Sequence, residues 1–238
     1  MEILHKTKDL HEILFYIHQT VLHKWDKYDL RDRLKEGLYQ KHGVAANNFL
    51  QTMPVNDARK AVGMFKDEYL LDYINIEEME VDKPEDIDER VIEKAIVRNI
   101  KKFIMTFGRD FAYIGNQYHL EIFGEELFPD LLFLNRELNC MVVVELKKGA
   151  FKPSYIGQLQ TYMKVLDDKV RKPHENPTIG ILLCKSANKA FVEYVIRDYN
   201  HPMGVATYKT AEDMSEELRK ALPDMDEMRK LLTDDSDI

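Results

Sequence analysis

Residues 140–148 read CMVVVELKK, and this stretch decides the fold that the sequence predicts. Its first half is apolar and rich in valine, which is typical of a strand buried on both faces of a sheet. The same strand then places Glu145 and Lys147 two residues apart, and side chains at that spacing point to one face. Because charges inside a core need partners, the end of this strand is a candidate functional site.

A second strand is predicted directly before the first, over LFPDLLFLN at residues 127–135. The RELN between the two strands is short and polar, so we expect a hairpin. A turn centred in the middle of RELN places Asp130 opposite Glu145. Opposed side chains have Cβ atoms about 4.5–5.5 Å apart, so this register brings two carboxylates together beside Lys147. A slip of one residue would separate them.

Two carboxylates at this separation repel each other unless a cation compensates their charge. Oxygen ligands suit Mg²⁺ or Mn²⁺, so Asp130 and Glu145 predict a divalent metal site. In the alternative interpretation, Lys147 neutralises the pair, and the three residues form an ordinary salt bridge at the end of a sheet. The hairpin alone leaves both interpretations open.

Two helices are predicted to contribute to the same region. The first covers residues 88–108 and places Glu93 at the margin of its apolar stripe, where the acid either finds a partner on the sheet or reaches solvent. The second covers residues 154–170 and places Gln158 and Tyr162 four residues apart on one face. Taken by themselves, such positions are more often packing residues and surface amides than parts of a site.

The remaining periodicities predict the other elements of the chain. Helices are expected over residues 9–25, 29–43, 56–74 and 188–199, strands over 111–122, 178–186 and 203–209, and an acidic connector over 77–89. The order of helix, three strands, helix and strand predicts a mixed α/β layer. We therefore expect a helical N-terminal region over residues 1–80, an α/β domain over 81–210, and a C-terminal helix with an acidic tail over 211–238.

Charge is unevenly distributed along the 238 residues. The formal net charge is −8, which argues mildly against nucleic-acid binding. The acids are concentrated in residues 71–90 and 211–238, however, and several basic side chains follow the hairpin. These basic side chains are Lys148, Lys152, Lys164, Lys169, Arg171 and Lys172. They predict either a local basic rim for phosphates or an ordinary solvated face.

The two cysteines and the apolar runs bear on the location of the protein. Cys140 and Cys184 lie in apolar, strand-like runs without a CxxC spacing, which favours buried, reduced thiols. No apolar run reaches the length that spans a bilayer, and the N-terminal MEILHKTKDL is no signal peptide. We therefore expect a soluble, cytoplasmic protein without a membrane partner.

Two short motifs resemble the signature of PD-(D/E)XK nucleases, namely PD at residues 129–130 and ELK at 145–147. The predicted order of helix, three strands, helix and strand is similar to the core of that fold. Gln158 and Tyr162 resemble the QxxxY element of its RecB-like branch.

A longer resemblance covers most of the chain. The run over residues 111–168, followed by 176–186 and 201–208, is similar to the bacterial YhcG family. The resemblance extends from about residue 23 to residue 208. Members of this family usually carry a longer N-terminal region before the helix around Trp25, so we expect a shortened helical region here, either winged-helix-like or a dimerisation unit.

The resemblance implies a restriction-endonuclease-like core with Mg²⁺ or Mn²⁺ as its cofactor. It implies that Asp130 and Glu145 bind the metal directly, and that the carbonyl of Leu146 is a further ligand. Lys147 would then orient or activate the attacking water, and Glu93 would hold a water on the metal.

Further residues are expected to position the substrate. The resemblance implies that Gln158 and Tyr162 position metal ligands or the nucleic-acid backbone. Lys148, Lys152 and Gln117, the last of these in the NQYH sequence before the hairpin, are expected to contact the DNA backbone.

The leading hypothesis is a metal-dependent endonuclease that hydrolyses phosphodiester bonds in DNA, in defence against foreign DNA or in its processing. A second hypothesis is a catalytically dormant nuclease fold that binds nucleic acid or a partner protein, which the acidic composition and the short N-terminal region favour. A third is a protein-binding scaffold that forms a homodimer through its N-terminal helices.

Overall fold

The computed structural model describes residues 10–39, 43–71, 89–108 and 110–210, together with residues 3, 6, 7 and 213. The chain divides into two compact units, one formed by residues 1–43 with 211–238 and the other by residues 44–210. Within the described ranges, no helix has both the length and the apolar character that crossing a bilayer requires. The acidic connector and the C-terminal helix of the prediction lie outside the described residues.

The first unit contains the helices α2 (Leu10–His23) and α3 (Lys27–Lys35). The first predicted helix is confirmed, whereas the second, predicted over 29–43, ends already at Lys35. The hydroxyl group of the buried Tyr16 links them. It donates to the carbonyl of Arg33 at 3.3 Å and accepts from the N–H of Tyr39 at 3.2 Å. A winged-helix-like or dimerising role of this unit stays a prediction.

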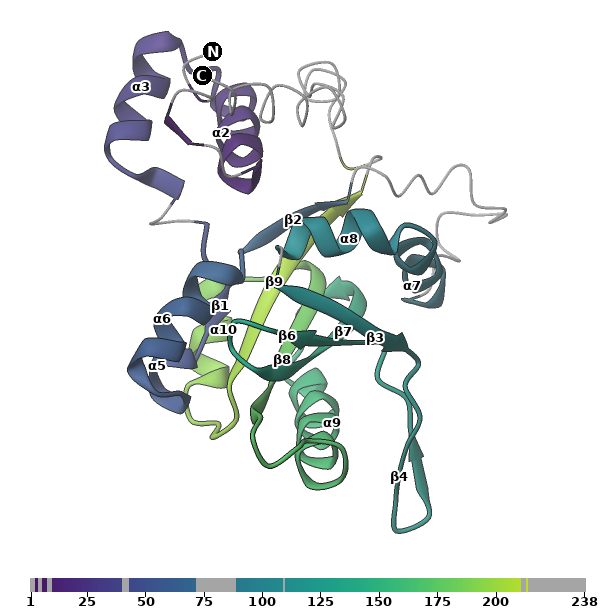
Figure 1. The fold of residues 1–238 in the computed structure, drawn as a ribbon. Coiled ribbons are helices and arrows are strands. Elements are labelled where there is room, and N and C mark those ends of the chain that lie inside the picture. Colours follow the sequence, from purple (N-terminus) through teal and green to yellow (C-terminus); the bar gives the residue numbers. More distant parts are fainter. Residues whose placement is uncertain are drawn as a thin grey trace, which may run out of the picture. The chain divides into compact units, whose positions relative to one another are not determined.

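A seven-stranded sheet forms the centre of the second unit (Figure 1). Its path is β1-β9-β8-β7-β6-β3, and β2 also pairs with β9. The strands are β1 (Ala46–Asn47), β2 (Glu68–Leu71), β3 (Phe111–Asn116), β6 (Leu131–Asn135), β7 (Cys140–Ala150), β8 (Asn176–Ser186) and β9 (Met203–Thr210). β7 has β6 antiparallel on one side and β8 parallel on the other, so CMVVVELKK lies inside the sheet, as predicted.

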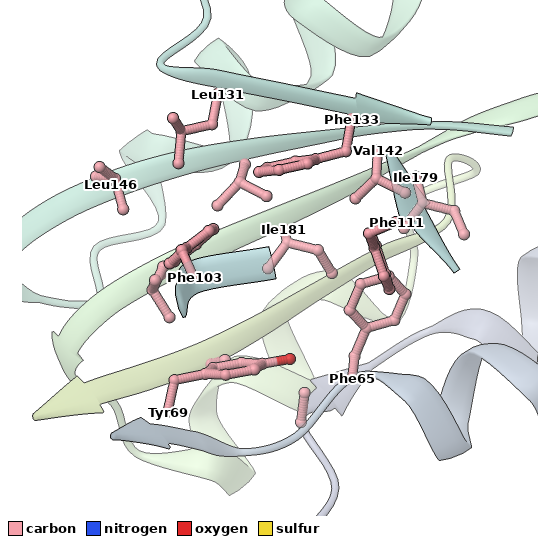
Figure 2. Packing of buried hydrophobic residues seen from close by; sticks show 14 of the residues in the cluster. Phe65, Tyr69, Phe103, Phe111, Leu131, Phe133, Val142, Leu146, Ile179 and Ile181 are labelled. Atoms are coloured by element: carbon pink, nitrogen blue, oxygen red, sulfur yellow. The ribbon is translucent and has the colours of Figure 1, made fainter. Parts of the chain in front are cut away.

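Helices cover both faces of the sheet. They are α5 (Phe49–Thr52), α6 (Val55–Met64), α7 (Glu89–Arg98), α8 (Ile100–Phe107), α9 (Ser154–Lys169) and α10 (Lys189–Ile196). Val142, Val144 and Leu146 of β7 pack in one core with residues of α6, α7 and α8 (Figure 2), whereas Met141 and Val143 pack in a second core with residues of α9 and α10. Side chains of the valine-rich strand β7 therefore pack in the cores on both faces of the sheet.

The alternation along β7 also decides where its charges lie. Because successive side chains point to opposite faces, Glu145 and Lys147 follow Val143 onto the face that α9 covers. The β6–β7 pair has the predicted register, with Leu131 opposite Val144. One further step along this register places Asp130 opposite Glu145, as expected.

The domain boundary differs from the one we expected at residue 80. β1 pairs antiparallel with β9 and β2 pairs parallel with β9, so residues 44–71 complete the α/β sheet. The helix predicted over 56–74 is wrong over residues 65–71, because α6 ends at Met64 and β2 follows. Local sequence allows a helix there, but the open backbone groups of β9 need partners, and this pairing overrides helix propensity.

Two other predicted elements are interrupted. The helix over 88–108 divides into α7 and α8 at Asn99, which has non-helical backbone angles (φ −112°, ψ 29°). The strand over 111–122 ends at Asn116, because Gln117 has a φ of 44°, in the left-handed region that ends an extended run. A small hairpin of β4 (Leu120–Ile122) and β5 (Glu125–Leu127) follows, and it projects from the sheet (Figure 1).

The tip of this small hairpin exposes an aromatic side chain. Phe123 is 98% exposed and has a φ of 53°, and Gly124 after it has a φ of 85°. Two positive φ angles in succession fit the two-residue turns that match the twist of a hairpin. Phe123 therefore stands at the turn with its ring in solvent.

Both cysteines are free and buried, as predicted. Cys140 packs in the core against α7 and α8, and Cys184 packs in the core against α9. Burial raises the pKa of the Cys140 thiol to about 12. The Cys140 sulfur is therefore no reactive thiolate near neutral pH.

Candidate active site

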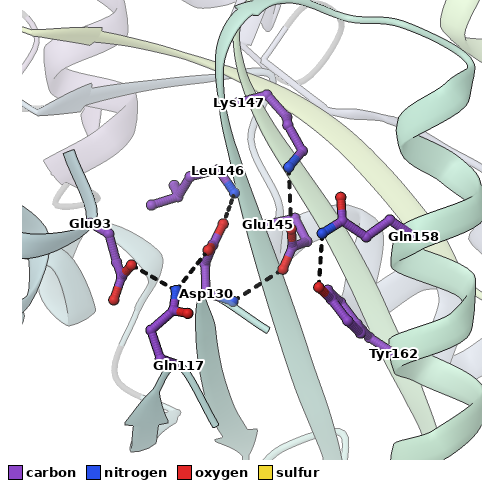
Figure 3. Close-up of polar contacts among 8 residues, drawn as sticks. All are labelled: Glu93, Gln117, Asp130, Glu145, Leu146, Lys147, Gln158 and Tyr162. Atoms are coloured by element: carbon purple, nitrogen blue, oxygen red, sulfur yellow. Dashed lines mark hydrogen bonds and ion pairs between the residues drawn. The ribbon is translucent and has the colours of Figure 1, made fainter. Parts of the chain in front are cut away.

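The carboxylates of Asp130 and Glu145 lie beside each other where β6 begins (Figure 3). The N–H of Asp130 donates to Glu145 Oε1 at 3.0 Å, and the N–H of Leu146 donates to Asp130 Oδ2 at 2.9 Å. The backbone of each strand therefore holds the carboxylate of the other. The structure brings together the two acids that the register placed opposite each other.

Pro129 explains why carboxylates replace the backbone ladder at this point. The hairpin register places Pro129 opposite Leu146, and proline has no N–H to donate. The carbonyl of Pro129 accepts from the N–H of Tyr118 at 3.2 Å, so the N–H of Leu146 turns to Asp130 instead. Since the N–H and C=O of one residue in an extended strand point to the same side, the Leu146 carbonyl faces the side on which Asp130 lies.

Burial and mutual repulsion govern the protonation of this pair. Glu145 is 1% exposed. Burial, and next the charge of Asp130, raise the pKa of the Glu145 carboxyl to about 8. Burial also raises the pKa of Asp130, against the hydrogen bond from Leu146 and the charge of Lys147. The doubly ionised pair is therefore costly unless a cation compensates it.

Lys147 supplies one positive charge next to the pair. Its side chain is almost fully buried, and its Nζ lies 3.4 Å from Glu145 Oε2 and 5.4 Å from the centre of the Tyr155 ring. The charge of Lys147 lowers the pKa of both Glu145 and Asp130. One ammonium group thus faces two carboxyl groups, so the salt bridge of the alternative interpretation exists but cannot compensate both carboxylates when both are ionised.

Glu93 joins the site from α7, which packs on the opposite face of the sheet. It is 4% exposed, so it is no snorkelling surface acid. Its Oε1 accepts from Asn116 Nδ2 at 2.8 Å, and its Oε2 accepts from Gln117 Nε2 at 2.7 Å. Gln117 Nε2 also donates to Asp130 Oδ1 at 3.0 Å. The amide of Gln117 therefore connects Glu93 to the carboxylate pair.

Two residues of this network were not predicted from the sequence. Asn116 holds Glu93, and the hydroxyl of Tyr113 donates to Asn116 Oδ1 at 2.9 Å. The available signal was the pair of consecutive amides, Asn116 and Gln117, in the middle of the strand predicted over residues 111–122. Adjacent amides there need partners, and the buried Glu93 is the partner of both.

Gln158 and Tyr162 lie together on the α9 side of the site (Figure 3). Gln158 Nε2 donates to the Tyr162 hydroxyl at 2.8 Å. Burial raises the pKa of this hydroxyl, and the charges of Glu145 and Asp130 raise it further. The predicted shared face is confirmed, and the pair lies near the carboxylates.

The basic residues after β7 divide into two groups. Lys164 pairs with Asp168 at 3.5 Å, and Arg171 pairs with Asp167 at 3.5 Å, as expected of a solvated helix face. Lys148, which follows Lys147 directly, and Lys152 are exposed close in sequence to the site. These two are the nearest in sequence to the carboxylates, and a basic rim there stays a prediction.

The donors at this point fit a hard divalent cation. Asp130 and Glu145 supply carboxylate oxygens, and the carbonyl of Leu146 faces the same side. Among the described residues, no three or more histidine, cysteine, aspartate or glutamate side chains form a cluster of the kind that holds a metal ion. A cation bound by the carboxylates of Asp130 and Glu145 would therefore take its remaining ligands from the Leu146 carbonyl and from waters. Mg²⁺ usually keeps several water ligands in this way.

Three solved structures are similar to parts of this chain, each at 16% identity. A repair endonuclease from Pyrococcus abyssi matches over 52% of this chain and 48% of its own, with a TM-score of 0.33. EndoMS in its apo form matches over 54% and 48% with a TM-score of 0.35, and the EndoMS–dsDNA2 complex matches over 57% and 51% with a TM-score of 0.34.

Sequence comparison gives a more specific result. The Escherichia coli (strain K12) protein "Putative nuclease YhcG" is 26% identical over 175 residues, which are 74% of this chain and 42% of that protein. The present chain therefore spans less than half of the length of this relative. The family described as YhcG PDDEXK nuclease domain matches residues 62–223. This match covers most of the chain and all the site residues described above, and the chain therefore belongs to the YhcG family of PD-(D/E)XK nuclease domains.

Proposed function

We propose that this chain is a metal-dependent nuclease domain that hydrolyses phosphodiester bonds in DNA, with Mg²⁺ or Mn²⁺ as its cofactor. The observation that supports the proposal most strongly is the pair of the half-buried Asp130 and the buried Glu145, each held by a backbone N–H of the other strand beside Lys147. A cluster with more carboxyl groups than ammonium groups and with raised carboxyl pKa values is typical of a functional site.

Each residue of the site has a role in this proposal. A cation held by Asp130, Glu145 and the Leu146 carbonyl would neutralise charge on the scissile phosphate and make water a better nucleophile. Lys147, fixed between Glu145 and the ring of Tyr155, has N–H groups that can orient the attacking water.

The surrounding residues hold this centre in place. Glu93, bonded to two amides, offers carboxylate oxygens as acceptors for a water. Gln158 and Tyr162 limit the space on the α9 side, where they contact the ligands or the DNA backbone. The exposed Lys148 and Lys152 attract phosphates electrostatically.

The dormant-fold hypothesis is disfavoured by the completeness of this arrangement. A module that only binds would gain stability by replacing Glu145 or Asp130 with neutral residues, because their burial is costly. The deciding experiment incubates the pure protein with supercoiled, linear and single-stranded DNA in Mg²⁺, in Mn²⁺ and in EDTA. We expect strand breaks with either cation and none in EDTA. Salt-sensitive DNA binding without breaks in any cation would support the dormant module instead.

Two neighbouring lysines provide a matched pair of variants. Lys147→Met removes the buried ammonium group beside Glu145, and we expect kcat to fall by about 100-fold or more, since general acid–base groups contribute at least this much. Lys148→Met removes an exposed charge, and we expect a higher KM and a smaller salt dependence with little change in kcat. Steady-state cleavage at several salt concentrations separates the two effects. Equal losses of kcat in both variants would contradict the roles assigned to them.

The biological setting is also a proposal. We propose a cytoplasmic protein that acts in defence against foreign DNA or in its processing, and the two buried thiols support a reducing location. Dimerisation through the N-terminal helices would supply two active sites for a double-strand break. Light scattering on the full chain tests this dimer.

A further inference from the structure

The position of Gln117 depends on an extra residue in β3. Pairing with β6 places Tyr113 opposite Phe133 but Gly115 opposite Leu132, so Ile114 is unmatched in a β-bulge. Bulges redirect the side chains that follow them and are common beside active sites. After this bulge, the next residue of the register beyond Asn116 is Gln117, opposite Asp130.

The backbone confirms this placement. The N–H of Gln117 donates to the carbonyl of Asp130 at 3.0 Å. Gln117, Asp130 and Glu145 therefore form a row across three adjacent strands. The φ of Gln117 is 44°, an uncommon value for a residue with a side chain. Such strained conformations persist where the surrounding structure requires them, and they gather at functional sites.

The amide of Gln117 fills the space between two acids. Its nitrogen donates to Glu93 Oε2 at 2.7 Å and to Asp130 Oδ1 at 3.0 Å, which uses both of its hydrogen atoms. The two carboxylates belong to Glu93 on α7 and to Asp130 at the start of β6. The neutral amide of Gln117 lies between them, although a cation in that position would compensate their charge better. Glu93 is held in addition by Asn116, so its carboxylate keeps its orientation.

We propose that Gln117 is a positioning residue that limits the site to a single divalent cation at Asp130 and Glu145, and that its amide occupies the position of a second cation, between Glu93 and Asp130. This inference rests on the proposed metal-dependent function. Glu93 then acts on the reaction through the Gln117 amide and water, while Asp130 and Glu145 bind the cation. An acidic side chain at position 117 would open the second position, because three carboxylates would meet there.

Titration with Mn²⁺ alone, in the full chain, tests the proposal. Calorimetry is expected to give one cation per chain for the original protein and two for Gln117→Glu. In the second case, electron paramagnetic resonance should show the coupled signal of two Mn²⁺ ions about 3.5–4 Å apart, the usual spacing of two-metal sites. The double variant Glu93→Gln/Gln117→Glu keeps the new acid but removes its partner, so it should return to one cation.

Gln117 is exposed, so the Gln117→Glu protein should remain folded, and thermal unfolding of every variant is measured first. Two cations in the original protein would overturn the proposal, as would one cation in a folded Gln117→Glu protein. The variant Asp130→Asn distinguishes failure of the proposal for Gln117 from failure of the proposed metal-dependent function. If the original protein binds Mn²⁺ and Asp130→Asn binds it equally well, the metal site itself has been assigned wrongly.

Discussion

Asp130→Asn is expected to reduce DNA cleavage at least about 100-fold, because a cation at this site is worth several kcal/mol of transition-state stabilisation. The fold should not suffer. Asparagine retains an oxygen that can accept from the N–H of Leu146, as Asp130 does now, and the variant loses the exposed hydrogen bond from Gln117 Nε2 to Asp130 Oδ1. This variant should therefore lose activity without losing stability.

The stability of this variant is expected to depend on pH in a specific way. Glu145 has an ordinary pKa of 4.5 and a folded-state pKa of about 8. Between these values the folded protein holds a proton that the unfolded chain has released, so the free energy of unfolding falls as the pH rises. Without the charge of Asp130, the pKa of Glu145 is lower and this fall is smaller. Asp130→Asn should therefore be more stable than the original protein at about pH 9.

Urea unfolding at about pH 6 and about pH 9, together with plasmid cleavage, measures both effects. Asp168→Asn is the matched control, because Asp168 is an exposed acid on α9 that pairs with Lys164. We expect this control to cut DNA as the original protein does. Undiminished cleavage by Asp130→Asn would show that the carboxylate pair is not the catalytic centre.

A chain of residues 81–210 is expected not to fold, whereas a chain of residues 44–210 is expected to fold cooperatively. The shorter chain lacks β1, α5, α6 and β2, and with them the fully buried Phe49, Phe65 and Tyr69. Loss of one large buried aromatic side chain costs about 3–5 kcal/mol. Three such losses reach the whole stability of a typical domain, about 5–15 kcal/mol.

The shorter chain would also expose the edge of β9. β1 covers one half of this edge and β2 covers the other, and an uncovered edge promotes aggregation. Circular dichroism during thermal unfolding and size-exclusion chromatography distinguish the two chains. A soluble 81–210 chain with the same unfolding midpoint as 44–210 would show that the N-terminal strands are dispensable.

The β6–β7 hairpin could be predicted from sequence because several local signals agree there. RELN is a short polar turn, and the apolar run before Glu145 fits only an interior strand. The pairing of Asp130 with Glu145 follows from these two facts and from the period of a strand.

The amide network could not be predicted, because it depends on irregular backbone. The bulge at Ile114 and the positive φ of Gln117 decide which amide reaches Glu93. The bulge has only the neighbouring Gly115 as a local signal, and the positive φ of Gln117 has no glycine or proline to mark it in the sequence. β2 was missed for a different reason, since its partner β9 lies far away in the chain and no local pattern encodes that pairing.

The two buried cysteines make the protein convenient for site-directed labelling. Cys140 and Cys184 are the only thiols in the chain, and both are enclosed in the cores. A cysteine introduced in place of Phe123, at the exposed tip of the β4–β5 hairpin, would be the single site open to a maleimide dye. Fluorescence from that dye could follow the arrival of DNA in real time without removal of either native cysteine.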